Sequence, residues 1–133
     1  PKKIYIDRSD SKSNNKNLRK ITNENEISAY LKKDSFKLIR LSDYKFIDQV
    51  RLFNNAEIII GLHGAGFANL VFCKTNTKII EFKSVSAGDI IKNIAIKKGL
   101  NYFDITKKPH SIFHYQLGDI EIKIDELKER LSS

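Results

Sequence analysis

The sequence contains a single cysteine, Cys73, and neither methionine nor tryptophan. One cysteine excludes an intrachain disulfide and a cysteine-based metal cluster, and it suits a reducing compartment. No apolar run approaches the roughly 18–20 residues that span a bilayer. The first residues, PKKIYIDR, lack the apolar core of a signal peptide. We therefore expect a cytoplasmic protein, and leave open a peripheral association with the inner face of the membrane.

Basic residues outnumber acidic ones, with 24 Lys and Arg against 16 Asp and Glu, which gives a formal net charge of +8. A basic chain suits an anionic partner, which is a nucleic acid, a membrane surface or a phosphorylated small molecule. The lysine pairs 32–33, 97–98 and 107–108 are scattered rather than gathered in one stripe. We therefore expect no nucleic-acid partner. The 133 residues, 41% of them hydrophobic, predict one folded domain, residues 1–133.

Short runs of β-branched residues alternate along the chain with segments whose apolar residues recur at helical spacing. Asn23 and Glu26 resemble a capping box at the start of the first helix, and Gly99 suits the end of a later one. A polar loop is expected at 9–17. The pattern predicts strands at 3–6, 36–41, 56–62, 78–82 and 102–105, helices at 23–31, 46–55, 67–73, 89–98 and 125–131, and an edge strand at 120–124.

This alternation predicts an α/β fold, a Rossmann-like domain of three layers around a parallel sheet in the order 2-1-3-4-5. The topological switch point then lies between the first and third strands. The segment Asp7-Arg8 and the segment 63–66 would face each other at the carboxyl ends of these strands, where such sheets bind ligands.

The segment 61–66, GLHGAG, leads from a strand through small residues into a helix. Glycine lets the backbone approach an anion, and a helix N-terminus offers N–H groups and partial positive charge, which suits a diphosphate. A tight strand-to-helix turn explains the same glycines without a ligand. His63 can donate to a phosphate oxygen or be a structural histidine.

Two of the few arginines flank the polar loop, in a chain that mostly uses lysine. Arg8 and Arg19 suggest planar, bidentate recognition of phosphate, and the alternative is solvated surface charge. The histidines at 110 and 114 have helical spacing but no third ligand in sight, so we expect no metal site.

Three polar residues near the glycine segment have competing interpretations. Glu81, at the end of a strand, can accept hydrogen bonds from ribose hydroxyls or form a surface pair with Lys83. Asn69 needs a partner inside its apolar helix, either a ligand or a backbone carbonyl. Gln49 is most simply a packing or hydrogen-bonding residue.

The order of these motifs resembles the carboxyl-terminal half of glycosyltransferase family 61, which includes capsular-polysaccharide proteins and xylosyl- and N-acetylglucosaminyltransferases. The resemblance covers about residues 4–103 and is more specific than HGAG alone. It is carried by YIDR (5–8), RKITNENE (19–26), FIDQ (46–49), AEIIIGLHGAGFANLVF (56–72) and IIEF (79–82).

The resemblance implies the carboxyl-terminal half of a GT-B glycosyltransferase, a nucleotide-sugar-binding domain whose acceptor-side domain is absent from this fragment. It also implies inverting transfer from a nucleotide-sugar to a glycan acceptor, with no metal or other cofactor required and with the catalytic base in the missing domain. Its implied site residues are Arg8, Arg19, His63, Gly64, Ala65, Gly66 and Asn69 for the donor diphosphate and Glu81 for the nucleoside.

One departure from the family pattern lies directly after HGAG. The family usually has Leu-Thr there, and this chain has Phe67-Ala68, which lacks the threonine hydroxyl as a phosphate donor. Two other functions fit the residues beside the glycosyltransferase. They are a non-catalytic nucleotide-binding module and, less favoured, a basic nucleic-acid-binding domain.

Overall fold

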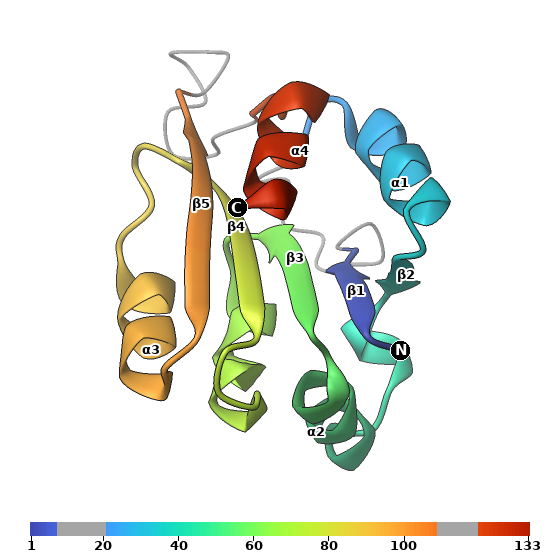
Figure 1. Ribbon diagram of the computed structural model, residues 1–133, viewed down its shortest axis with the longest axis vertical. Coiled ribbons are helices and arrows are strands. Elements are labelled where there is room, and N and C mark those ends of the chain that lie inside the picture. The colour runs from blue at the N-terminus through green and yellow to red at the C-terminus, as the bar shows by residue number, and fades with distance from the viewer. Residues whose placement is uncertain (8–20, 109–119) are drawn as a thin grey trace.

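The computed structural model describes residues 1–7, 21–108 and 120–133 (Figure 1). Within them a five-stranded parallel sheet has the order β2-β1-β3-β4-β5, which confirms the predicted order. The strands are β1 (Lys3–Ile6), β2 (Lys37–Ile39), β3 (Ile58–Leu62), β4 (Lys78–Ser84) and β5 (Asn101–Lys107). The helices are α1 (Glu24–Lys33), α2 (Phe46–Asn55), α3 (Ile90–Lys98) and α4 (Ile124–Ser132), with 3-10 helices η1 (Leu41–Asp43) and η2 (Ala65–Phe72).

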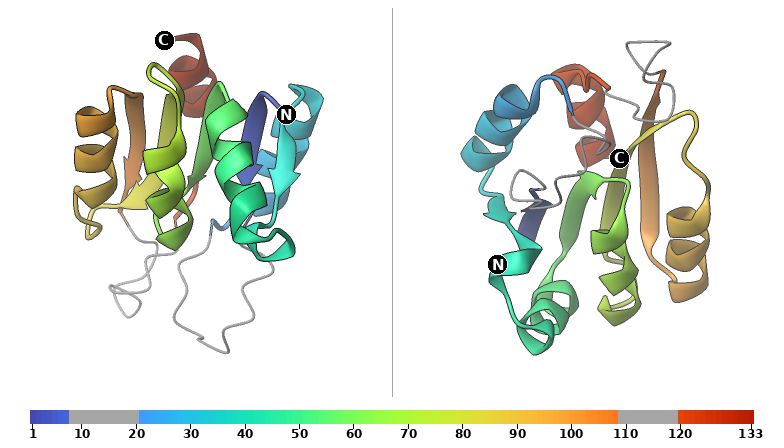
Figure 2. Two further views of the ribbon diagram at one scale, coloured as in Figure 1. Left: turned by 90° about the horizontal axis from the view of Figure 1, so that it is seen from below. Right: turned by 180° about the vertical axis from the view of Figure 1, so that it is seen from behind.

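Helices cover both faces of the sheet, so the fold has the three predicted layers. Figure 2 shows α2, η2 and α3 on one side of the sheet and α1 and α4 on the other. Successive strand residues point to opposite faces, and Ile59 and Ile60 of β3 are both fully buried in different clusters. Burial on both faces explains why β3 is a continuous apolar run.

The helix predicted over 67–73 after the glycine segment is present as a 3-10 helix, η2, over Ala65–Phe72. Phe67, Leu70 and Cys73 are all buried and lie three residues apart. Because a 3-10 helix has three residues per turn, this spacing puts the three side chains on one side of η2, against the sheet. The second strand is also shorter than predicted, since the chain turns into η1 at Leu41.

Asn23 precedes α1 as predicted, but the capping box is wrong, because its side chain makes no capping hydrogen bond. Its amide nitrogen donates to the carbonyl of Ile122 at 2.6 Å, and its amide oxygen accepts from the backbone N–H of Ile122 at 3.1 Å. The edge strand expected at 120–124 is also wrong. Ile120 forms only an isolated bridge with Ile21, and Asn23 satisfies the next backbone groups in place of a strand.

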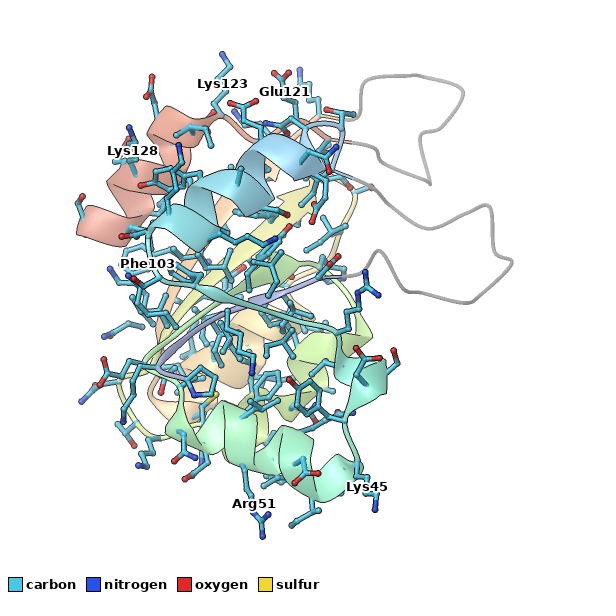
Figure 3. All side chains as sticks on the ribbon, turned by 90° about the vertical axis from the view of Figure 1, so that its right-hand side faces the viewer. Lys45, Arg51, Phe103, Glu121, Lys123 and Lys128 are labelled. Carbon is cyan, nitrogen blue, oxygen red and sulfur yellow. The ribbon has the colours of Figure 1, made fainter. Side chains whose placement is uncertain are left out.

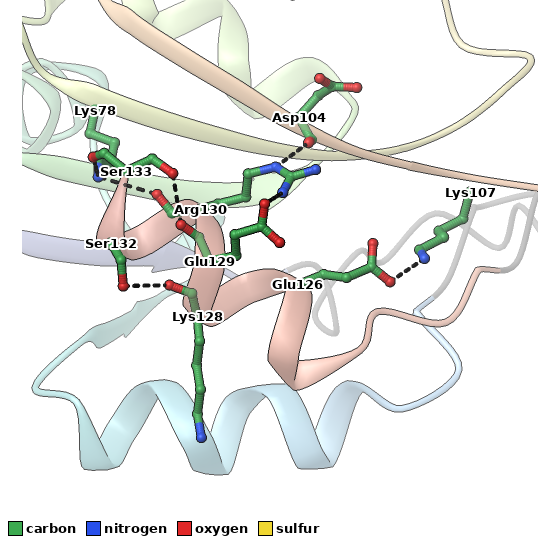
Figure 4. A network of polar contacts seen from close by, with 9 residues as sticks. All are labelled: Lys78, Asp104, Lys107, Glu126, Lys128, Glu129, Arg130, Ser132 and Ser133. Atoms are coloured by element: carbon green, nitrogen blue, oxygen red, sulfur yellow. Dashed lines mark hydrogen bonds and ion pairs between the residues drawn. The ribbon is translucent and has the colours of Figure 1, made fainter.

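The last helix is attached to the sheet by cations whose partners are distant in sequence (Figure 4). The ammonium group of Lys78 on β4 donates to the carbonyls of Arg130, Leu131 and Ser133, at 2.7–3.2 Å. The Arg130 side chain donates to the carbonyl of Asp104 on β5 at 3.1 Å. A cation among the last carbonyls of a helix also complements its dipole.

Basic side chains lie on both outer layers of the molecule. In Figure 3, Lys45 and Arg51 extend from the α2 layer, while Lys123 and Lys128 extend from the opposite layer. The positive charge of the described residues is therefore spread over both faces. Within these same residues, every helix is too short or too polar to span a membrane.

Candidate functional site

The candidate site lies at the carboxyl edge of the sheet, between β1 and β3. The two strands pair in parallel, with Ile6 opposite Gly61, so the residues that follow them emerge side by side. Asp7 follows β1, donates its backbone N–H to Ile39 at 2.8 Å and lies 3.9 Å from the Arg40 guanidinium. The predicted switch point is confirmed. Arg8 and Arg19 lie outside the described residues, so their role stays a prediction.

Side chains crowd two positions of the glycine segment. A Cβ added at Gly61 would lie 3.2 Å from the Phe67 ring and 3.3 Å from Cβ of Ile6. A Cβ added at Gly66 would lie 2.9 Å from a methyl carbon of Leu41. Close packing against buried side chains therefore accounts for Gly61 without a ligand, whereas the close contact at Gly66 is with the end of a flexible side chain. A diphosphate role for Gly64, Ala65 and Gly66 stays a prediction.

Phe67, where the sequence departs from the family pattern, is a core residue. It is buried, and its ring lies against the bare backbone of Gly61. The aromatic side chain thus fills space on the sheet that a side chain at position 61 would otherwise occupy. Ala68, which replaces the threonine, is exposed.

The polar centre of the site is Glu81, which joins side chains from three neighbouring strands. Nδ1 of His63, the residue after β3, lies 2.5 Å from Oε2 of Glu81 on β4. The hydroxyl of Tyr102 on β5 donates to Oε1 of the same carboxylate. Glu81 is fully buried, whereas 19% of the His63 side chain is exposed. The buried carboxylate therefore connects the interior to a histidine at the surface of the carboxyl edge.

Burial explains why this carboxylate has two polar partners. A carboxylate in the protein interior is strongly destabilised unless hydrogen bonds or an opposite charge replace the water it has lost. Burial, followed by the hydrogen bond to Glu81 and the charge of Glu81, raises the pKa of Tyr102 above its ordinary range. Tyr102 thus keeps its proton and serves as a donor to Glu81.

The surface pair of Glu81 with Lys83, one of the two interpretations drawn from the sequence, is wrong. Lys83 is itself buried, and its ammonium lies 3.2 Å from the carboxylate of Asp89, just before α3. Glu81 and Lys83 lie two residues apart on β4 and so share a face, but each has its own partner. The carboxyl edge therefore holds a second buried ionisable side chain, which the sequence pattern did not single out.

Asn69 has a side-chain partner, where the sequence left open a ligand or a backbone carbonyl. Its amide donates to Oε1 of Gln49 on α2 at 2.9 Å. The Gln49 amide in turn donates to the carbonyls of Leu41 and Tyr44, at 2.8 and 3.1 Å. The hydrogen-bonding role predicted for Gln49 is confirmed. Asn69 thus connects η2 to α2 and, through Gln49, to both ends of η1. Its contact with a diphosphate stays a prediction.

Tyr102 is the site residue that sequence reasoning missed. A tyrosine in a strand is ordinary, and its bond to Glu81 depends on which strands are neighbours and on their register. No local pattern carries that information. Among the described residues, no three His, Cys, Asp or Glu side chains are grouped as a metal ion would need. The pair His110 and His114 lies outside them.

The fold and the site together define a Rossmann-like α/β protein whose polar side chains gather at the edge where such sheets bind ligands. A family model described as Glycosyltransferase 61 matches residues 1–80. The chain belongs to glycosyltransferase family 61, which confirms the resemblance drawn from the motifs.

Similar proteins are EGF domain-specific O-linked N-acetylglucosamine transferases from animals. The rat protein is 33% identical over 105 residues, which are 75% of this chain and 20% of that protein. The chicken protein is 32% identical over 95 residues, 68% of this chain and 18% of that protein. The fruit-fly protein is 31% identical over 87 residues, 63% of this chain and 17% of that protein. This chain thus spans about a fifth of the length of the curated relatives it matches.

Proposed function

We propose that this chain is the donor-binding part of an inverting glycosyltransferase. The observation that supports this most is His63, held on the buried carboxylate of Glu81 at the carboxyl edge beside the switch point. Sheets of this topology bind nucleotides at that edge. In a family 61 chain, the diphosphate of a nucleotide-sugar is the ligand that fits a histidine beside glycine-lined backbone.

The proposed reaction is an in-line displacement at the sugar. An acceptor hydroxyl attacks the anomeric carbon, its proton passes to a base, and the bond from that carbon to the nucleoside diphosphate breaks with inversion. Negative charge develops on the departing diphosphate. Fixed donors such as His63, the backbone at 64–66, Arg8 and Arg19 would stabilise that charge more in the transition state than in the ground state.

The other components of the reaction belong to the same proposal. The acceptor glycan and the catalytic base would be held outside this chain, and no metal ion would be required. Because the similar animal proteins are O-linked N-acetylglucosamine transferases, N-acetylglucosamine is the first donor sugar to test. The whole enzyme would act in the cytoplasm, at the inner face of the membrane if it associates peripherally.

Calorimetric titration of the chain with UDP, GDP, ADP and CDP tests the proposal. We expect saturable binding of one diphosphate and about ten- to a hundredfold weaker binding after Arg8→Ala or His63→Ala, because each removes a hydrogen bond to a charged group. Arg51→Ala is the control, since Arg51 is an exposed arginine on α2 whose described ion pair is to Asp48 of the same helix. Absence of saturable binding, or equal losses in Arg8→Ala and Arg51→Ala, would contradict it.

A further inference from the structure

We propose that Glu81 and Tyr102 are positioning residues that orient the imidazole of His63 toward the donor diphosphate. The proposal rests on the proposed function, because it assigns His63 to the diphosphate. It differs from the role that the family resemblance implies for Glu81, which is contact with the nucleoside. The two roles predict different results in a double-mutant cycle with His63→Ala.

The three side chains form one connected chain of hydrogen bonds from the interior to the carboxyl edge. Tyr102 donates to one oxygen of Glu81, and the Nδ1 atom of His63 lies 2.5 Å from the other. His63 directly follows β3, Glu81 lies on β4 and Tyr102 lies on β5, and these three strands are adjacent in the sheet. Strands hold side chains more precisely than loops do, so this arrangement suits a positioning role.

The full burial of Glu81 argues against direct contact with the nucleoside. None of its surface is exposed to solvent, and both oxygens already have protein partners. A ribose hydroxyl could reach this carboxylate only if His63 or Tyr102 moved away. Of the pair His63 and Glu81, only the histidine has a solvent-exposed side chain.

The chemistry of imidazole gives the carboxylate its role. A ring bonded to a carboxylate through Nδ1 can serve a phosphate only through Nε2, and the carboxylate fixes both the ring orientation and the Nδ1 proton. With Nδ1 bonded to Glu81, the ring presents Nε2 as its second hydrogen-bonding atom toward a phosphate oxygen. Tyr102 keeps the Glu81 carboxylate turned toward the ring by holding its second oxygen.

Two conservative variants and two matched controls test the proposal by diphosphate titration. Glu81→Gln removes the charge, and Tyr102→Phe removes the hydroxyl. Glu57→Gln removes an exposed charge at the amino edge of the sheet, away from the site. Tyr5→Phe removes a buried tyrosine hydroxyl that also donates to a glutamate, Glu24, on the opposite face. Circular dichroism spectra and thermal melts would show that each variant folds.

We expect Glu81→Gln to weaken binding about ten- to a hundredfold and Tyr102→Phe about three- to tenfold, with both controls unchanged. A double-mutant cycle then separates positioning from contact. If Glu81 acts through His63, Glu81→Gln has no further effect in a His63→Ala background. Losses that add in the double variant would overturn positioning and favour contact with the nucleoside.

Nitrogen-15 NMR of the histidine ring provides a readout that needs no ligand. In the wild-type chain we expect an Nδ1 proton on His63 that is protected from exchange with water, and its loss in Glu81→Gln but not in Glu57→Gln. An Nδ1 signal that is identical in wild type and Glu81→Gln overturns the proposal. If that signal behaves as expected but no diphosphate binds, the proposed function fails, and the positioning for a donor fails with it. Equal affinities of wild type and Glu81→Gln overturn positioning alone.

Discussion

His63 and Glu81 lie 18 residues apart in sequence, yet Nδ1 of the histidine is 2.5 Å from the buried carboxylate of the glutamate. The parallel pairing of β3 and β4 causes this proximity, because it places Leu62 opposite Phe82 and so brings the ends of the two strands together. Glu81 occupies a fully buried position, where an apolar side chain is usual. Its partner stands at the ligand-binding edge of the fold.

Gly61→Ala should destabilise the chain by about 1–3 kcal/mol, because the new methyl group would press on Phe67 and Ile6, which are both buried. Gly88→Ala is the matched control. A Cβ at position 88 meets no atom within 4 Å, so we expect no loss of stability. Urea unfolding measures both. Equal stabilities of the two variants would show that the contact between Gly61 and Phe67 is not tight.

Asn69 and Gln49 should act as one unit in stability. Removing either side chain breaks the hydrogen bond between them, so Asn69→Ala and Gln49→Ala should each cost about 1–2 kcal/mol. The double variant should lose less than the sum, with a coupling of about 1 kcal/mol. Urea unfolding of the four chains gives the coupling. Strictly additive losses would mean that the two side chains do not depend on each other.

Asn23→Ser distinguishes helix capping from pairing with Ile122. Serine caps a helix as well as asparagine does, so a capping role predicts nearly unchanged stability. A serine side chain is too short to pair with both backbone groups of Ile122, so we expect a loss of about 1–2 kcal/mol in thermal or urea unfolding. A variant as stable as wild type would refute the pairing as the source of stability.

Stability should fall at alkaline pH. Burial raises the pKa of the Cys73 thiol to about 12, while an unfolded thiol titrates at roughly pH 8.5. Above that pH the unfolded chain binds fewer protons than the folded one, so the free energy of unfolding decreases as pH rises. Burial also raises the pKa of Tyr5 and Tyr102, which extends the decrease above roughly pH 10.

Urea unfolding between pH 7 and pH 10.5 measures this decrease. Cys73→Ala removes the thiol, so the decrease between pH 8.5 and pH 10 should become shallower in that variant. Alkylation by iodoacetamide at pH 8.5 should be far slower in the folded chain than in urea, because the thiolate is the reactive form. Equal alkylation rates in the two conditions would contradict the burial of Cys73.

Much of the fold could be predicted because its signals are local. The apolar run of β3 reflects burial on both faces of the sheet, and the helical periods of α2 and α3 and the glycine after α3 reflect contacts between residues close in sequence. Gly99 has a φ of 75°, as its predicted place at the end of α3 requires. The parallel strand order followed from the alternation of strands and helices. The motif order was specific enough to indicate the family.

The candidate site was only partly within reach of the sequence. Composition and motif order singled out His63 and Glu81 but gave no indication that they touch each other. Asn23 matched a local capping pattern, but a backbone segment 99 residues away takes its side chain. Local patterns cannot describe such competition, because the outcome depends on which distant groups the fold brings near.

The sequence by itself thus determined most of the elements, their parallel order and the family, since periodicity and motif order are properties of neighbouring residues. Only the tertiary structure decided that Glu81 is buried, that Tyr102 joins it to the site, and that Lys83 pairs elsewhere. The physical reason is strand register. Which side chains share a face and meet across a sheet is fixed when all strands and helices pack together.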